Sequence, residues 1–351
     1  MWGPNQSSWL MALLQVDTAS GQSMYFLPMT LEWGDSDEEQ IRAIGAATLA
    51  RVRQQSQVGV LADAFSDEAF CRAMVESIGA GSVMACAHGK LCFIQTSAFA
   101  RLAGDAIAKL PLVRSKFLSS NTVVMLGDSL FLKGYRNLRS GVNPEFELGR
   151  FLTEVARFAN CVPVAGAIEY IADDGTSTCL ALLQGYVANQ GDGWTNTLDY
   201  LERYFGSQLA ATAEPPADVH GAYLSLVHTL GTRTAELHKA LATRTGDPAF
   251  DPETLAPGEF DGWKQRVHDD ALATLALLEQ HLTRFPPAAL KNANILLEQR
   301  HRLLARIESC DMPAGPYLKT RYHGDYHLGQ VLVSNNDFII IDFEGEPARS
   351  M

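Results

Sequence analysis

The 351-residue sequence predicts an α+β fold in two lobes. In the first half, short apolar runs alternate with turn residues, which is typical of strands and hairpins. From about Trp194 onward, apolar residues recur at helical spacing over long segments, and one short hairpin returns near the end. Because strands and helices are segregated along the chain, this order favours an α+β arrangement over a doubly wound parallel sheet.

Four hairpins are predicted in the first half, each formed by two apolar runs that flank a glycine-containing turn. They join 9–16 with 23–31, 82–86 with 91–96, 121–126 with 130–135, and 167–171 with 178–183.

Two helices interrupt these hairpins. The first is predicted over Asp67–Ile78, where apolar residues recur at helical spacing behind a good N-cap, Ser66. The second opens at Asn143-Pro144, because Asn can cap a helix and Pro suits its first position.

The second half is predicted to be mainly helical, with Pro- and Gly-rich linkers between the helices. The helical segments are 197–205, 220–242, 262–283 and 287–310, and the late hairpin pairs 330–334 with 338–342.

Composition and charge exclude several classes of protein. Hydrophobic residues make up 47% of the chain and charged residues 19%, which excludes a disordered chain. The net charge of −12 argues against a nucleic-acid or anionic-membrane partner. No stretch approaches the roughly 20 apolar residues of a membrane helix. The six cysteines form no CxxC pair, so we expect reduced thiols in a cytoplasmic protein.

The segment RYHGDYHLGQVLVSNNDFIIIDFEGEP, residues 321–347, carries the chemistry. Gln330 follows Asp325 by five residues, and Asp342 lies at the end of an apolar strand that the hairpin would fold back toward Asp325. Mg²⁺ favours oxygen donors such as a carboxylate and an amide. Phosphoryl transfer needs such a metal site, a carboxylate that orients the acceptor hydroxyl, and a cation for the nucleotide phosphates.

HGDYHLGQ followed by IDFEGEP resembles the catalytic and metal-binding loops of the protein-kinase-like superfamily, in the branch that contains aminoglycoside phosphotransferases. The fuller string is more similar to the maltokinase family, which also occurs fused to trehalose synthase. The resemblance covers most of the chain from about Leu31 on. It includes the segments SSNT, FLKGYRNLRSGVNPEFELGRFLTE, LLQGYVANQGDGWTNTLDYL and RTAELHKAL.

The resemblance implies a bilobal protein-kinase-like fold with an N-terminal cap subdomain. The cap would cover 1–110, the kinase N-lobe with its nucleotide-binding sheet 111–187, and a mostly helical C-lobe 188–351. Since the family continues with further C-terminal helices, the C-lobe is expected to be truncated.

The same resemblance assigns roles to residues of the catalytic centre. Asp325 would be the catalytic base, and Gln330 and Asp342 would hold Mg²⁺. Lys133 would contact the ATP phosphates and pair with Glu147 in the next helix. Glu145 is the alternative partner, although it lies two residues away and so on a different helix face.

Further residues would surround the nucleotide. Ser120, Asn121 and Thr122 belong to a turn that would cover the phosphates, and Gln184, Tyr186 and Val187 to a hinge that would meet adenine through its backbone. One departure concerns the triplet Asp342-Phe343-Glu344, which ends in glutamate where related kinases have glycine.

The implied activity is the ATP-dependent conversion of maltose to maltose 1-phosphate, with ATP and Mg²⁺ as cofactors and association or fusion with trehalose synthase. Two alternatives stay open. One is a kinase for another small hydroxyl acceptor, such as an aminoglycoside or choline-like amine, whose positive charge would favour an acidic pocket. The other is an inactive accessory domain derived from a trehalose synthase fusion.

Overall fold

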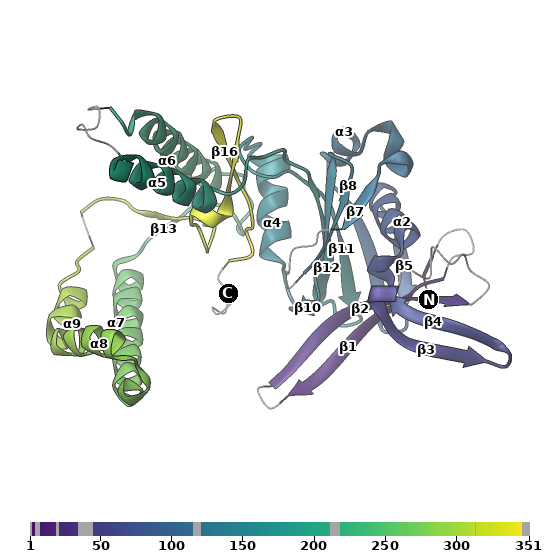
Figure 1. The fold of residues 1–351 in the computed structure, drawn as a ribbon, viewed down its shortest axis with the longest axis horizontal. Helices are drawn as coiled ribbons and strands as arrows, with labels where there is room; N and C mark the ends of the chain where they lie inside the picture. Colours follow the sequence, from purple (N-terminus) through teal and green to yellow (C-terminus); the bar gives the residue numbers. More distant parts are fainter. Residues whose placement is uncertain are drawn as a thin grey trace. The chain divides into compact units, whose positions relative to one another are not determined.

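The computed structural model describes residues 2–3, 8–18, 21–33, 45–114, 121–210, 218–312 and 314–345. The chain divides into two compact units (Figure 1). The larger unit contains Met1–Leu241 and Tyr322–Met351, and the smaller unit contains Ala242–Arg321.

The strands of the larger unit form three antiparallel sheets. A five-stranded sheet has the order β1-β2-β4-β3, with β10 paired to β2, and a seven-stranded sheet has the order β5-β6-β11-β12-β9-β8-β7. The third sheet is the hairpin β15-β16. The bounds are β1 Leu10–Thr18, β2 Gly21–Trp33, β3 Thr48–Gln54, β4 Gln57–Asp63, β5 Val83–Cys86, β6 Gly89–Gln95, β7 Leu112–Arg114, β8 Thr122–Leu126, β9 Leu130–Gly134, β10 Asn137–Leu138, β11 Val164–Ala172, β12 Ser177–Gly185, β15 Val331–Ser334 and β16 Asp337–Ile340.

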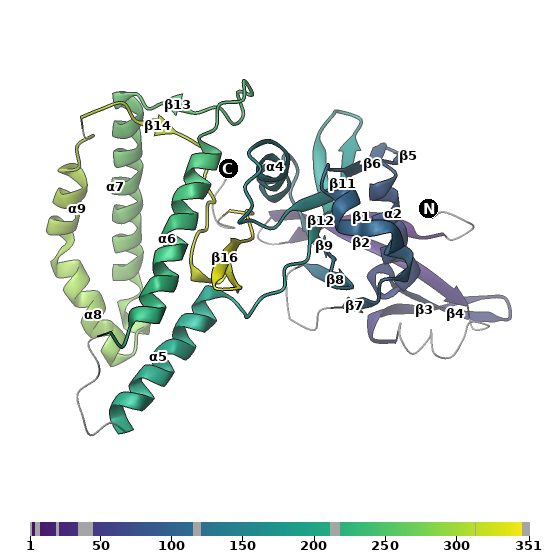
Figure 2. The ribbon, with the colours of Figure 1, turned by 90° about the horizontal axis from the view of Figure 1, so that it is seen from above.

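The helices of the larger unit are α2 Glu68–Gly79, α3 Phe99–Ala103, α4 Pro144–Arg150, α5 Gly193–Ala210 and α6 Gly221–Leu241. The smaller unit contains α7 Pro257–Gln280, α8 Pro287–Glu298 and α9 Arg300–Glu308, together with the short pair β13 Glu253–Thr254 and β14 Leu318–Lys319 (Figure 2). In the described part of the chain, no helix combines the length and the apolar character that crossing a bilayer requires.

All five predicted hairpins are confirmed by the strand pairing. The predicted helix start at Asn143-Pro144 is also confirmed. The Asn143 side chain accepts a hydrogen bond from the Phe146 amide at 2.9 Å, and Pro144 occupies the first turn.

Two predicted helix boundaries were wrong. Asp67, and not Ser66, caps α2, because its carboxylate accepts a hydrogen bond from the Ala69 amide at 2.8 Å. The Ser66 hydroxyl instead bonds the Asp63 carbonyl in the preceding turn. The helix predicted over 287–310 is interrupted at Gln299, whose ψ of 7° departs from helical geometry.

The predicted boundary at 110 between the cap and the N-lobe does not coincide with a break in the sheets. The seven-stranded sheet joins β5 and β6, which precede residue 110, to strands that follow it. Residues 242–321, within the predicted C-lobe, form a unit of their own. The division at 110 and 187 therefore stays a prediction.

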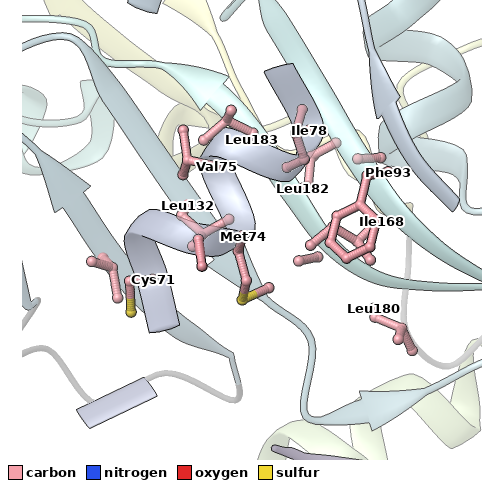
Figure 3. Close-up of a cluster of buried hydrophobic side chains, with 14 of the residues drawn as sticks. Cys71, Met74, Val75, Ile78, Phe93, Leu132, Ile168, Leu180, Leu182 and Leu183 are labelled. Atoms are coloured by element: carbon pink, nitrogen blue, oxygen red, sulfur yellow. The ribbon is translucent and has the colours of Figure 1, made fainter. Parts of the chain in front are cut away.

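The main core lies between α2 and the seven-stranded sheet. Met74 and Ile78 of α2 lie among Leu132 of β9, Ile168 of β11 and Leu183 of β12 (Figure 3). All five side chains are fully buried. This core stabilises the sheet strands that position the site described below.

Helices α5 and α6 support the β15-β16 hairpin. The two helices contact each other where Tyr200 stacks on Tyr223, with ring centroids 4.1 Å apart. The Arg233 guanidinium of α6 forms two hydrogen bonds of 2.8 Å to the Asp337 carboxylate at the start of β16. Such a bidentate pair fixes orientation as well as distance.

We expect Met74→Ala to lower the free energy of unfolding by about 2–5 kcal/mol, because it removes a buried side chain and leaves a cavity. Urea denaturation followed by circular dichroism would measure the change. Val83→Ala is the matched control, since Val83 is 65% exposed, and should change stability by less than about 0.5 kcal/mol. Equal effects of the two substitutions would contradict the assignment of this core.

Candidate active site

Lys133 lies on one face of the central strands of the seven-stranded sheet. It pairs with Val123 of β8, and Phe131, two residues earlier on β9, pairs with Gln184 of β12. Cross-strand partners and alternate residues share one face of a sheet, so these side chains point the same way. They line a cavity of about 360 Å³.

The cavity has an apolar part and a charged end. Val123, Val162 and Leu332 supply apolar walls, and Lys133 and Asp342 supply opposite charges. Apolar walls with a few polar groups are typical of small-molecule sites. Such a site would accommodate a flat apolar ring together with an anionic group near Lys133.

The Lys133 ammonium pairs with Glu145, at 2.8 Å between Nζ and Oε2. This corrects the preferred assignment of Glu147 and supports the alternative. Glu145 lies in the first turn of α4 and is buried, and residues two apart on a helix point about 200° away from each other. Only one of the two glutamates can therefore face the sheet.

Two further donors stabilise the Glu145 carboxylate. Tyr135 donates its hydroxyl hydrogen at 2.6 Å, and the Gln184 amide donates at 3.3 Å. Sequence analysis missed Tyr135, although its position two residues after Lys133 is the alternation expected for one sheet face. The predicted contact between the Gln184 backbone and adenine stays a prediction.

Burial and charge act in opposite directions on the buried pair. Burial alone would lower the pKa of Lys133, but the carboxylates of Glu145, Glu344 and Asp342 outweigh it and raise this pKa. Burial also raises the pKa of Glu145 to about 7, against the opposing effect of Lys133. Lys133 therefore stays positively charged throughout the physiological range.

The β15-β16 hairpin brings Gln330 beside Asp342. The Ile341 amide donates to the Gln330 carbonyl at 3.0 Å, and the Gln330 side-chain amide donates to Asp342 Oδ2 at 3.1 Å. Asp342 has φ of +63°, a left-handed conformation that non-glycine residues rarely adopt. This conformation turns the chain directly after β16, and Asp342 Oδ1 lies 3.5 Å from Lys133 Nζ.

His323 connects the Asp325 loop to the end of β16. One ring nitrogen, Nε2, bonds the Ile341 carbonyl at 2.8 Å, and the other, Nδ1, lies 3.4 Å from the Asp325 amide. A carbonyl only accepts and an amide N–H only donates, so the ring carries its proton on Nε2 and is neutral. Burial lowers the pKa of His323 and so favours this form. The ring thereby positions Asp325 next to the segment that bears Asp342.

Glu344 adds a third carboxylate to the charged end of the cavity. It forms an ion pair with Lys133, and oxygens of Glu145, Asp342 and Glu344 all lie within 4.8 Å of one another. One ammonium among three carboxylates leaves an excess of negative charge. The Asp342 carboxylate and the Gln330 amide oxygen are hard donors of the kind that Mg²⁺ prefers, so these residues fit a divalent cation.

The predicted phosphate-covering turn is described only in part. Ser120 lies outside the described residues. The side-chain nitrogen Nδ2 of Asn121 lies 3.4 Å from Glu344 Oε1. The Thr122 hydroxyl accepts a hydrogen bond from the Arg136 guanidinium at 2.7 Å. In the predicted hinge, the Tyr186 amide donates to the Ser129 carbonyl at 2.8 Å, and Tyr186 and Val187 both line the cavity.

Comparisons with known proteins point to one group of enzymes, although no family model matches the chain. It is 24% identical over 230 residues to a glucosamine kinase of Streptacidiphilus jiangxiensis, an alignment that covers 65% of this chain and 46% of that protein. Over 229 residues it is also 24% identical to a glucosamine kinase of Mycolicibacterium smegmatis, with 65% and 50% covered. The chain thus spans about half the length of these relatives.

Solved structures of glucosamine kinase share the mixed α/β fold. One, in complex with glucosamine, ADP and inorganic phosphate, has a TM-score of 0.57 at 16% identity, covering 99% of this chain and 70% of that chain. Another, in crystal form A, has a TM-score of 0.55 at 16% identity, covering 97% and 67%.

We expect part of the stability to disappear at acidic pH because of His323. Its pKa in the folded chain lies below the ordinary value of 6.5. Between these two pKa values the unfolded chain binds more protons than the folded chain. The contribution of His323 to the free energy of unfolding is therefore fully present above about pH 6.5 and is lost as the pH falls through the folded pKa. The non-titrating variant His323→Gln should lack this component.

Urea denaturation of both proteins between pH 5 and 8 would measure the difference in the free energy of unfolding. The difference should shrink as the pH falls. A difference that is constant over this range would show that His323 does not titrate as the hydrogen bonds imply.

Proposed function

We propose that this chain forms the nucleotide-binding and catalytic part of an ATP-dependent kinase that phosphorylates a sugar hydroxyl. One observation carries the proposal: Lys133 with its partner Glu145 and Asp342 with its partner Gln330 meet at one end of an apolar cavity. A phosphate-binding cation next to hard oxygen donors is the combination that phosphoryl transfer needs. The similarity to enzymes named glucosamine kinase supports the same reaction class.

In the proposed complex, adenine occupies the apolar part of the cavity near Tyr186 and Val187. Lys133 binds the phosphates, and Glu145 keeps its ammonium oriented toward them. Asp342 and the amide oxygen of Gln330 would hold Mg²⁺, which supplies charge neutralisation of the phosphates when bound. The bilobal, kinase-like division of the chain belongs to this proposal.

Asp325 acts as the base in this scheme. Its carboxylate accepts the proton of the acceptor hydroxyl while that oxygen forms a bond to the γ-phosphorus. The bond between the γ-phosphorus and the bridging oxygen breaks, and ADP leaves with the electron pair. His323 acts as a positioning residue, because it joins the Asp325 backbone to the Ile341 carbonyl.

Glucosamine is the first acceptor to test, because the similar proteins are named for it. Maltose is the second, since only the resemblance of the sequence to the maltokinase family suggests it. The comparisons offer no support for an association with trehalose synthase, and the proposal does not include one.

A coupled assay of ADP release with glucosamine, maltose, an aminoglycoside and choline tests the function. We expect turnover with a sugar, and we expect Asp325→Asn to lower it at least about 100-fold, in keeping with the usual contribution of a general base. ATP affinity measured by calorimetry should change little in this variant, because Asp325 does not bind the nucleotide in this scheme.

Three results would contradict the proposal. Turnover with the aminoglycoside or choline, but with neither glucosamine nor maltose, would indicate the other acceptor class. Binding of Mg·ATP without turnover on any acceptor would favour an accessory domain. Substantial activity of Asp325→Asn would contradict its role as the base.

The partner of Lys133 can be tested by two matched variants in α4. Glu145→Gln removes the charge that orients Lys133, and we expect ATP affinity to fall about tenfold, which corresponds to about 1.4 kcal/mol. Glu147→Gln makes the same chemical change two residues away and should alter affinity less than about twofold. Isothermal calorimetry measures both, and the reverse ranking would restore Glu147 as the partner.

A further inference from the structure

We propose that Glu344 is a built-in competitor for nucleotide phosphate at Lys133, an inference that rests on the proposed function. The residue ends the triplet Asp342-Phe343-Glu344, where related kinases have glycine. A glycine could not contact Lys133, whereas the Glu344 carboxylate forms an ion pair with its ammonium. The carboxylate thus offers Lys133 the same kind of anionic oxygen that a phosphate would.

The number of hydrogen-bond donors on Lys133 limits how many anions it can bind. An ammonium group has three N–H donors. Three carboxylates surround it, with Glu145 at 2.8 Å, Asp342 at 3.5 Å and Glu344 in direct contact. A phosphate oxygen can therefore reach this ammonium only when one of the carboxylates moves away.

The three carboxylates around Lys133 differ in how firmly they are held. Glu145 is 2% exposed and also accepts hydrogen bonds from Tyr135 and Gln184, so it is held in place. Asp342 is anchored by the Gln330 amide and by its place at the end of β16. Glu344 and Asp342 are each about one-third exposed, but the contact of Glu344 besides Lys133 is with Asn121, at the long distance of 3.4 Å. Glu344 is therefore the partner that is displaced most easily.

Space next to Glu344 can receive its carboxylate when it leaves Lys133. Glu344 also lines a second cavity of about 280 Å³, together with Asn121, Asn137 and Arg139. Side-chain amides and a guanidinium can donate hydrogen bonds to a carboxylate. Gly345 follows directly with φ of +75°, and among the described residues a Cβ at this position would meet no atom within 4 Å. The chain thus has both a receiving space and a permissive backbone next to Glu344.

The consequence is a selective barrier. An incoming nucleotide must displace Glu344. The apparent affinity for the nucleotide is therefore the intrinsic affinity multiplied by the fraction of molecules in which Lys133 is accessible. Metal-free nucleotides carry the greatest negative charge and leave the charges of Asp342 and Glu344 uncompensated. Glu344 should therefore penalise them more strongly than the magnesium complex.

The test is calorimetric titration of ADP and ATP, with and without Mg²⁺, into the wild-type chain and Glu344→Gln. If the ion pair with Glu344 is present in about 90% of molecules, the variant should bind metal-free nucleotide about tenfold more tightly. The gain with Mg²⁺ present should be smaller. Glu202→Gln on α5 is the matched control, because it removes one exposed carboxylate outside the site and should leave both affinities unchanged.

Three results would overturn the inference. Unchanged nucleotide affinity in Glu344→Gln, with sugar phosphorylation retained, would overturn the competitor role. The proposed function would not be affected by that result. Weaker Mg²⁺-dependent binding by Glu344→Gln would show that Glu344 helps to bind nucleotide or metal. Absence of nucleotide binding in both proteins would overturn the inference together with the proposed function. Tighter binding by Glu344→Gln alone supports it.

Discussion

The ion pair between Lys133 and Glu145 is the interaction on which the site depends. Both side chains are removed from most solvent, so either charge alone would be costly, and each requires the other. The pair joins strand β9 to helix α4, and its two residues are separated by 12 positions in the sequence. Tyr135 and Gln184 complete the hydrogen bonding of the carboxylate, so the ammonium is held at a defined place in the cavity wall. Every proposed function of this cavity requires that placement.

A second set of interactions delivers the oxygen donors to Lys133 from the far end of the chain. The β15-β16 hairpin sets Gln330 beside Asp342, which adopts a left-handed conformation two residues after β16 ends. His323 ties the Asp325 loop to the same strand, and Arg233 of α6 holds the hairpin from its opposite end. These interactions place the groups that the proposed phosphoryl transfer requires. The choice of acceptor depends on other residues that line the acceptor site.

Much of this arrangement could be predicted from sequence, because it rests on local patterns. Glycine-containing turns between apolar runs predicted the hairpins, and Asn143-Pro144 predicted the start of α4. The late hairpin predicted that Asp342 folds back toward the Asp325 loop, which His323 bonds to the neighbouring Ile341 carbonyl. The choice between Glu145 and Glu147 could not be settled in this way, since it depends on which face of α4 meets the sheet. The contact between Glu344 and Lys133 and the separation of residues 242–321 likewise arise from tertiary packing, which no local pattern encodes.

The most direct test is a crystal structure of this chain with Mg²⁺ and a non-hydrolysable ATP analogue. The account predicts adenine against the apolar walls near Val187, a phosphate oxygen bonded to Lys133 Nζ, the metal bound by Asp342 and Gln330, and the Lys133–Glu145 pair intact. A nucleotide bound away from Lys133, or a Lys133 side chain that pairs with neither Glu145 nor phosphate, would contradict it.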